Sequence, residues 1–139
     1  WYEEQFVELA DILFEKNLFE KVYLICSKKN DHMASKIINL SKNKYFINCS
    51  KYDLANIMGI MKKSSFYVGN NSGPVNVAAA LGVKSFGLVC NDPVSELKYS
   101  KILAITPDNY KDNTWNRDRN GMKKLTVDKV SNFILDKIK

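Results

Sequence analysis

The segment best suited to chemistry is FYVGNNSGPVNVAAALG, residues 66–82, in which a β-rich apolar run passes directly into an alanine-rich helix. The transition consists of small and polar residues: Gly69, Asn70, Asn71, Ser72 and Gly73. Small residues let the backbone approach a ligand. The first amide groups of a helix have no internal partner and carry the positive end of the helix dipole. The segment therefore predicts an anion site suited to a phosphate, to which Ser72 could add a hydroxyl donor.

A plain strand-to-helix turn explains the same residues about as well from physics alone. The chain has neither the lysine of a P-loop nor a G-x-G-x-x-G run, which disfavours P-loop and dinucleotide-binding proteins. The residues alone leave the choice between turn and phosphate site open.

Other polar residues are weaker candidates. Asp92 and Glu96 could form an acid and base pair, but nothing positions a substrate between them, so a capping role is favoured. His32 has no metal-ligand neighbours and is interpreted as a surface or helix-start residue. A basic, aromatic lip for an anionic acceptor is one interpretation of the loop that contains Trp115, Arg117 and Arg119, and a loop without a role is the other.

Apolar periodicity predicts the elements that position these residues. Strands are expected over residues 21–27, 44–48, 65–69, 84–90 and 102–106, and a long polar surface loop over 107–124. Helices are expected over residues 3–17, 33–41, 54–61, 74–82 and 126–138. Asp53 and Thr126 are suited to cap two helix starts, and Gly82 is suited to end the helix that Pro74 begins.

This alternation predicts an α/β fold of Rossmann-like, three-layer α/β/α type, with right-handed crossovers and a parallel sheet whose strands are buried on both faces. Ligands bind such sheets at the carboxyl ends of the strands, where loops enter helices. The bend at residues 70–73 is expected to lie there.

Length and composition indicate one packed domain over residues 1–139, with 45% hydrophobic and 26% charged residues. The chain begins at Trp1 with a helix and no leading strand, so we interpret it as a fragment. No apolar run approaches a membrane span and no signal peptide opens it. The net charge of +6 comes from scattered lysines, so a solvated surface is favoured, while an anionic sugar nucleotide or an acidic membrane surface is compatible.

The cysteines are Cys26, Cys49 and Cys90, which are far apart, odd in number and without a C-x-x-C pair. This pattern encodes neither a disulfide framework nor a zinc site. We therefore expect a reducing, cytoplasmic location and no bound metal.

The run GNNSGPVNVAAALG, residues 69–82, resembles the G-N-D-S-G-P-x-H-x-A-A-A-L-G segment of glycosyltransferase family 9, the ADP-heptose:lipopolysaccharide heptosyltransferases. Trp1 is similar to the tryptophan of the family's K-x-W segment, and residues 52–70 and the terminal helix are similar to further family segments. The resemblance implies the carboxy-terminal half of a two-domain GT-B enzyme. It also implies a nucleotide-diphosphate sugar donor, such as ADP-heptose, and a lipopolysaccharide, related glycan or lipid-linked acceptor.

The resemblance also implies site residues. Ser72 and Gly73 would hold the pyrophosphate, and Asn71 would face the sugar or the phosphates. Asp31 lies near the family's ribose-binding glutamate, although an N-cap of the following helix is the favoured alternative. Tyr52 could stack on the adenine, and the alternative is that its ring is simply partly buried. The implied nucleotide-sugar site as a whole is Asp31, Tyr52, Asn70, Asn71, Ser72, Gly73 and Asn76.

Departures from the family's pattern support a second interpretation. Asn71 stands where the family has aspartate and Asn76 where it has histidine, so a charge and a titratable ring are lost. The alternative is a non-catalytic, degenerate nucleotide-binding or assembly module of the same fold. A flavodoxin-like signalling domain is disfavoured, because no acidic cluster gathers at the strand ends. The family's catalytic base belongs to the other domain, so this fragment alone is expected to be inactive. No cofactor and no nucleic acid are expected, and peripheral contact with the inner membrane is compatible.

Overall fold

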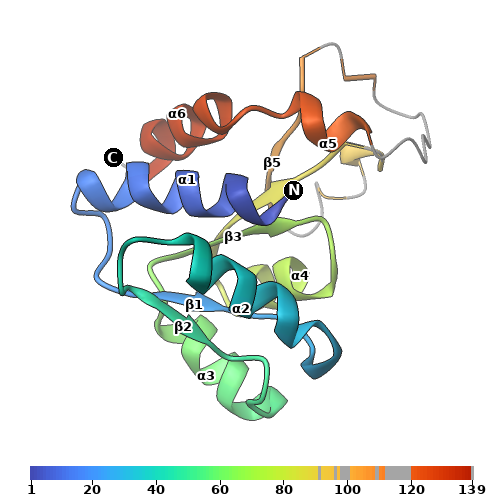
Figure 1. Ribbon diagram of the computed structural model, residues 1–139. Coiled ribbons are helices and arrows are strands. Elements are labelled where there is room, and N and C mark those ends of the chain that lie inside the picture. Colours follow the sequence, from blue (N-terminus) through green and yellow to red (C-terminus); the bar gives the residue numbers. More distant parts are fainter. Residues whose placement is uncertain (91, 96, 98–100, 109, 112–119, 139) are drawn as a thin grey trace. The chain divides into compact units, whose positions relative to one another are not determined.

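The computed structural model describes residues 1–90, 92–95, 97, 101–108, 110–111 and 120–138. The chain forms two compact units. The first unit is Tyr2–Ile60, and the second unit is Met61–Lys139 together with Trp1. In both units helices alternate with parallel strands (Figure 1), as the apolar periodicity predicts.

The first unit opens with α1 (Glu3–Glu15), β1 (Val22–Leu24), a short 3-10 turn (Lys28–Asn30) and α2 (Asp31–Leu40). It continues with β2 (Phe46–Asn48) and most of α3 (Leu54–Lys63). β1 and β2 form a parallel pair from Val22 opposite Phe46 to Leu24 opposite Asn48. The face of α1 that packs inward is apolar and consists of Val7, Leu9, Ala10 and Leu13.

β1 differs from its prediction as a strand buried on both faces. The side chain of Tyr23, at its centre, is 41% exposed. The sheet of the first unit has only two short hydrogen-bonded strands among the described residues, and tyrosine tolerates water at its phenol end. The prediction of full burial is therefore wrong for β1.

The second unit contains β3 (Phe66–Asn70), α4 (Gly73–Ala80), β4 (Lys84–Leu88) and β5 (Leu103–Ile105). It ends with α5 (Asn120–Lys124) and α6 (Val127–Ile138). Its strands are parallel, in the order β3-β4-β5.

The core of the second unit lies on β4, which is the central strand of the sheet. Phe86 and Leu88 are fully buried. The ring of Phe86 meets those of Phe66 and Phe133 edge-on, at centroid distances of 6.2 and 6.3 Å. Because neighbours cover β4 on both sides, it fits the buried parallel strand that its apolar sequence predicts.

The residues predicted at three helix ends are confirmed. The Asp53 carboxylate accepts a hydrogen bond from the Asn56 amide at 2.8 Å, and the Thr126 hydroxyl oxygen accepts one from the Lys129 amide at 3.3 Å. Gly82 follows α4 with a φ of +80°, which glycine adopts at little cost.

The expected loop over residues 107–124 is wrong at its end. Residues 120–124 form α5, in which the Met122 sulfur lies 3.3 Å from the Cys90 sulfur. A five-residue helix with so little apolar character has no periodicity to detect. Trp115, Arg117 and Arg119 lie outside the described residues.

None of the helices in the described part of the chain has both the length and the apolar character needed to cross a membrane.

Candidate functional site

The bend between β3 and α4 is open to solvent. The Asn71 amide donates to the Leu88 carbonyl at 3.1 Å, which carries the pairing with β4 one residue past β3. Ser72 then adopts an extended conformation, with φ −161° and ψ 176°, and α4 begins at Gly73. Ser72 and Gly73 are exposed, and a Cβ atom built on Gly73 would meet nothing within 4 Å. The bend is therefore accessible at the carboxyl end of β3.

The first turn of α4 has no side-chain cap. The Ser72 hydroxyl does not bond a helix amide but donates to the Asn70 carbonyl at 3.1 Å. Pro74 has no amide hydrogen, so Gly73 and Val75 supply the donors of this turn, which a helix leaves without internal partners. Together with the helix dipole, these donors form a place for an anion.

Gly69 has a packing role. A Cβ atom at this position would lie 2.8 Å from the ring and hydroxyl of Tyr67, which points to the same face of β3. Burial raises the pKa of Tyr67 to about 12. The contact with Tyr67 gives Gly69 a steric reason within the strand, and close approach of a ligand to its backbone stays a prediction.

Asn70 is held by Trp1. The backbone nitrogen of Trp1 donates to Asn70 Oδ1 at 2.7 Å, and the Trp1 indole nitrogen donates to the Leu125 carbonyl at 2.7 Å. Trp1 is only 7% exposed. Asn70 therefore fastens Trp1 to the second unit.

Asn71 is bonded to Asp92. Its Nδ2 donates to Asp92 Oδ2 at 2.8 Å, and the Tyr110 hydroxyl donates to the Asp92 backbone carbonyl. These three residues follow β3, β4 and β5 in turn, so their bonds join the carboxyl ends of neighbouring strands. The Asp92 carboxylate thus accepts a hydrogen bond from a side chain, and its favoured capping role stays a prediction. Glu96 lies outside the described residues.

Asn76 is exposed on the first turn of α4. Its Nδ2 donates to the Ser72 carbonyl, four residues earlier, at 3.0 Å. Its side chain is thus folded back on its own helix.

Asp31 is the first residue of α2, in the first unit. Its Oδ1 accepts from Asn48 Nδ2 at 3.0 Å and from the Ser50 hydroxyl, while Asn48 Oδ1 accepts from the Ser50 amide at 2.9 Å. The bonds from Ser50 and Asn48 hold the pKa of Asp31 below its usual value. The N-cap interpretation is wrong, because Asn30 takes that position and the Asp31 carboxylate turns to residues at the end of β2 and just beyond it.

Tyr52 lies in the turn between β2 and α3. Its amide donates to the Cys49 carbonyl at 3.1 Å, and its side chain is 49% exposed. The ring is accessible to a planar ligand, and stacking on a base stays a prediction.

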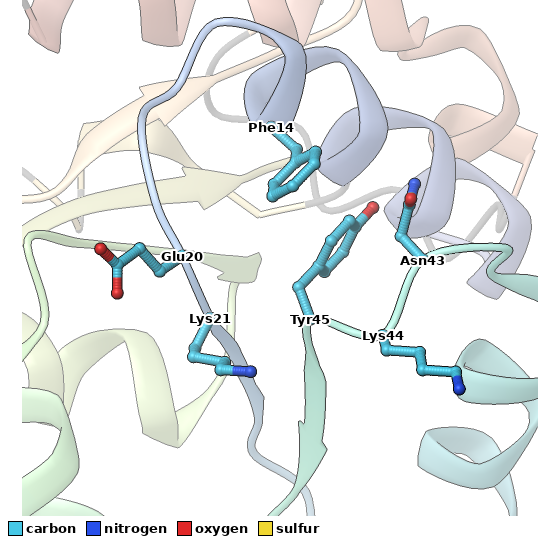
Figure 2. A pocket seen from close by; sticks show the side chains of 6 residues that line it. All are labelled: Phe14, Glu20, Lys21, Asn43, Lys44 and Tyr45. Atoms are coloured by element: carbon cyan, nitrogen blue, oxygen red, sulfur yellow. The ribbon is translucent and has the colours of Figure 1, made fainter.

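A shallow pocket of the first unit lies at the amino end of its two strands (Figure 2). Its lining residues precede β1 and β2 or come from α1, and they are Phe14, Glu20, Lys21, Asn43, Lys44 and Tyr45. The Phe14 and Tyr45 rings are 4.9 Å apart, and Asp11 accepts hydrogen bonds from Tyr45 and Asn43. Parallel sheets bind ligands at the carboxyl end, so we interpret this pocket as a packing feature.

The three cysteines are thiols that form no disulfide bond in the described part of the chain. Burial is the main cause that raises the pKa of Cys26, Cys49 and Cys90, the last to about 11. His32 is exposed on α2, and the described residues contain no group of three or more histidine, cysteine, aspartate or glutamate side chains that could hold a metal ion.

The structure thus brings together one subset of the predicted site residues, at the start of α4: Asn70, Asn71, Ser72, Gly73 and Asn76. Asp31 and Tyr52 belong to the first unit, near the carboxyl end of β2. The sequence alone did not reveal the partners of Asp31 or the bond between Asn71 and Asp92. The only signal in the sequence was the presence of polar residues shortly after the strands.

The family model described as glycosyltransferase family 9 (heptosyltransferase) matches residues 1–114. Among solved structures, the chain is similar to the E. coli ADP-heptose lps heptosyltransferase II, with a TM-score of 0.81 and 19% sequence identity. The match covers 99% of this chain and 41% of that chain. At that identity the likeness shows the fold, which is the predicted GT-B α/β architecture. No curated protein sequence matches the chain.

Proposed function

Because the chain belongs to glycosyltransferase family 9, we propose that it binds a nucleotide-diphosphate sugar of the ADP-heptose type for transfer to a glycan acceptor. It would do so as the carboxy-terminal part of a two-domain enzyme, in keeping with the 41% share of the similar heptosyltransferase that it spans. Residues 1–139 would act as one nucleotide-sugar-binding domain.

The observation that carries this proposal is the open, uncapped start of α4. The amide groups of Gly73 and Val75 would donate to the diphosphate, and rotation of the Ser72 hydroxyl away from Asn70 would add a third donor. These donors are fixed before the ligand arrives. They can therefore stabilise the negative charge that grows on the diphosphate as it leaves the sugar.

The reaction would need a base that this chain does not supply. In the proposal, a carboxylate from the other domain removes the proton of the acceptor hydroxyl, whose oxygen attacks the anomeric carbon of the sugar. The bond from that carbon to the diphosphate breaks, and its electrons go to the diphosphate oxygen. The second unit contributes the donors that stabilise this charge.

The first unit has groups suited to a nucleoside. Asp31 Oδ1 is occupied by Asn48 and Ser50, whereas its Oδ2 has no hydrogen-bond partner among the described residues. A lowered pKa keeps the carboxylate ionised, so it can accept bonds from ribose hydroxyls. The exposed Tyr52 ring would stack on the base.

The acceptor and the location are part of the same proposal. The similar solved structure is that of an lps heptosyltransferase, which supports a lipopolysaccharide, related glycan or lipid-linked acceptor. A net charge of +6 is compatible with peripheral contact at the cytoplasmic face of the inner membrane.

Calorimetric titration of the complete protein with ADP, UDP and GDP tests the proposal. We expect one of these diphosphates to bind, and the matching monophosphate to bind more weakly because it has one phosphate fewer to accept from α4. A folded, complete protein that binds none of the three would remove the proposal.

A non-catalytic module of the same fold is the second candidate, and Asn76 is the observation that favours it. The family's histidine could exchange a proton at this position, whereas the amide of Asn76 is directed to the Ser72 carbonyl of its own helix. A transfer assay with the native protein decides between the candidates. Turnover of a donor by the native protein would exclude the module.

A further inference from the structure

The bonds that join the strand ends of the second unit place one carboxylate beside the start of α4. Asp92 follows β4, and its Oδ2 lies 2.8 Å from Nδ2 of Asn71, which directly precedes the N-cap of α4. The Tyr110 hydroxyl holds the backbone of Asp92 from the β5 side. Asp92 is therefore held from two neighbouring strand ends, through its side chain by Asn71 and through its backbone by Tyr110.

Within the described part of the chain, one oxygen of this carboxylate has a hydrogen-bond partner. Asn71 takes Oδ2, and Oδ1 has no hydrogen-bond partner among the residues that the structure describes. Asp92 is partly exposed. An accessible carboxylate oxygen is a strong acceptor for hydroxyl groups.

A neutral residue at position 71 suits the neighbouring carboxylate of Asp92. An aspartate there would set two carboxylates within contact distance, which disfavours ionisation of both. Asparagine can instead donate to Asp92. The family has aspartate at the position of Asn71. In this chain the carboxylate beside the start of α4 comes instead from Asp92, which follows β4.

We propose that Asp92 accepts hydrogen bonds from hydroxyl groups of the donor's sugar, with Asn71 as the residue that positions it, and that the site thereby prefers neutral sugars to sugars with a carboxylate. This inference rests on the proposed function. A phosphate would be repelled by Asp92 and attracted by the amide groups of α4, so the diphosphate takes the helix start and the sugar lies next to Asp92.

Titration of the complete protein and its Asp92→Asn variant tests the inference. Each is titrated with the nucleoside diphosphate that the native protein binds and with its neutral hexose or heptose conjugate. We expect the variant to bind the diphosphate within about twofold of the native protein and the sugar conjugate about tenfold more weakly, since a hydrogen bond to a charged group is lost. Retained diphosphate binding also shows that the variant is folded.

A reciprocal exchange tests the positioning role of Asn71. Asn71→Asp alone should raise the KM for the sugar conjugate about tenfold, because two carboxylates then repel each other. The double variant Asn71→Asp with Asp92→Asn restores one charge and one amide, and it should recover most of the loss.

A conjugate with a uronic acid tests the preference for neutral sugars. It should bind the native protein at least about tenfold more weakly than the neutral conjugate, and Asp92→Asn should reduce this difference in affinity.

Two results would overturn the inference while leaving the proposed function intact. One is an Asp92→Asn variant that binds the sugar conjugate as tightly as the native protein does. The other is an equal loss for the diphosphate and its conjugate, which would place Asp92 away from the sugar. A native protein that binds no diphosphate at all would instead remove the proposed function.

Discussion

The carboxyl ends of the two parallel sheets offer opposite chemistry. Beyond β2, Asp31 gathers donors from Asn48 and Ser50 and remains a hydrogen-bond acceptor on its other oxygen. Beyond β3, the uncapped start of α4 presents main-chain donors. One region suits hydroxyl groups and the other suits an anion.

The two regions also differ in burial. β4 is covered on both faces, whereas Tyr23 at the centre of β1 is 41% exposed. A short apolar run therefore forms a buried strand in the second unit and a partly exposed strand in the first unit. The well-buried strand is the one that contacts α4, where we propose that amide donors with a fixed direction bind the diphosphate.

The largest effect that we expect is on the stability of the sheet that contains this strand. Phe86→Ala removes a fully buried ring that contacts Phe66 and Phe133, so the free energy of unfolding should fall by about 3–5 kcal/mol. Urea denaturation measures it. The matched control is Tyr23→Ala on β1, which should cost much less because that ring is already partly in water. Equal losses would contradict the difference in burial.

A smaller effect is expected at the start of α4. Gly73→Asp adds a carboxylate where space is open, and it should weaken binding of a nucleoside diphosphate about 100-fold, since like charges about 4 Å apart cost several kcal/mol at an effective dielectric constant of about 20. The same carboxylate interacts favourably with the helix dipole, so the melting temperature should stay level or rise. The isosteric Gly73→Asn serves as control. If both variants bind equally well, the phosphate lies elsewhere.

The smallest effect concerns Asp31 and pH. Its pKa in the folded protein is lowered by the bonds from Ser50 and Asn48, so its contribution to stability is present above its unfolded pKa of about 3.9 and is lost as the pH falls through the folded value. Asp31→Asn should therefore lower the melting temperature near pH 7, and the difference from the native protein should shrink below about pH 4.

Ser50→Ala is the matched test of the cause. It removes the first donor to Asp31 while it leaves Asn48 in place, so it should give a smaller change with the same pH dependence. A difference that is independent of pH would show that the carboxylate is not stabilised by these bonds.

Sequence reasoning succeeded where the signal is local. The helix start at Asp53 and the end at Gly82 follow from residues a few positions apart, and both are confirmed. The bend at Ser72 and Gly73 was likewise visible, because small residues before a helix are contiguous. The α5 helix was missed, since five residues carry too little periodicity.

Sequence reasoning failed where the partner lies far along the chain. Asp31 was expected to cap the helix beside it, but its partners are 17 and 19 residues away, and the Asn71 bond to Asp92 spans 21 residues. A carboxylate has equal chemical reasons to bond near or distant donors. Which donors lie near the carboxylate depends on how the parallel strands pair, and the sequence near the carboxylate does not show this.

Trp1 has a practical consequence for dissecting this protein. Its indole and backbone nitrogens donate to Leu125 and Asn70, yet the next residue of the second unit is Met61. The second unit therefore includes a residue that is distant from the rest of it along the chain. Expression of residues 61–139 by themselves would remove the buried indole and its hydrogen bond to the Leu125 carbonyl.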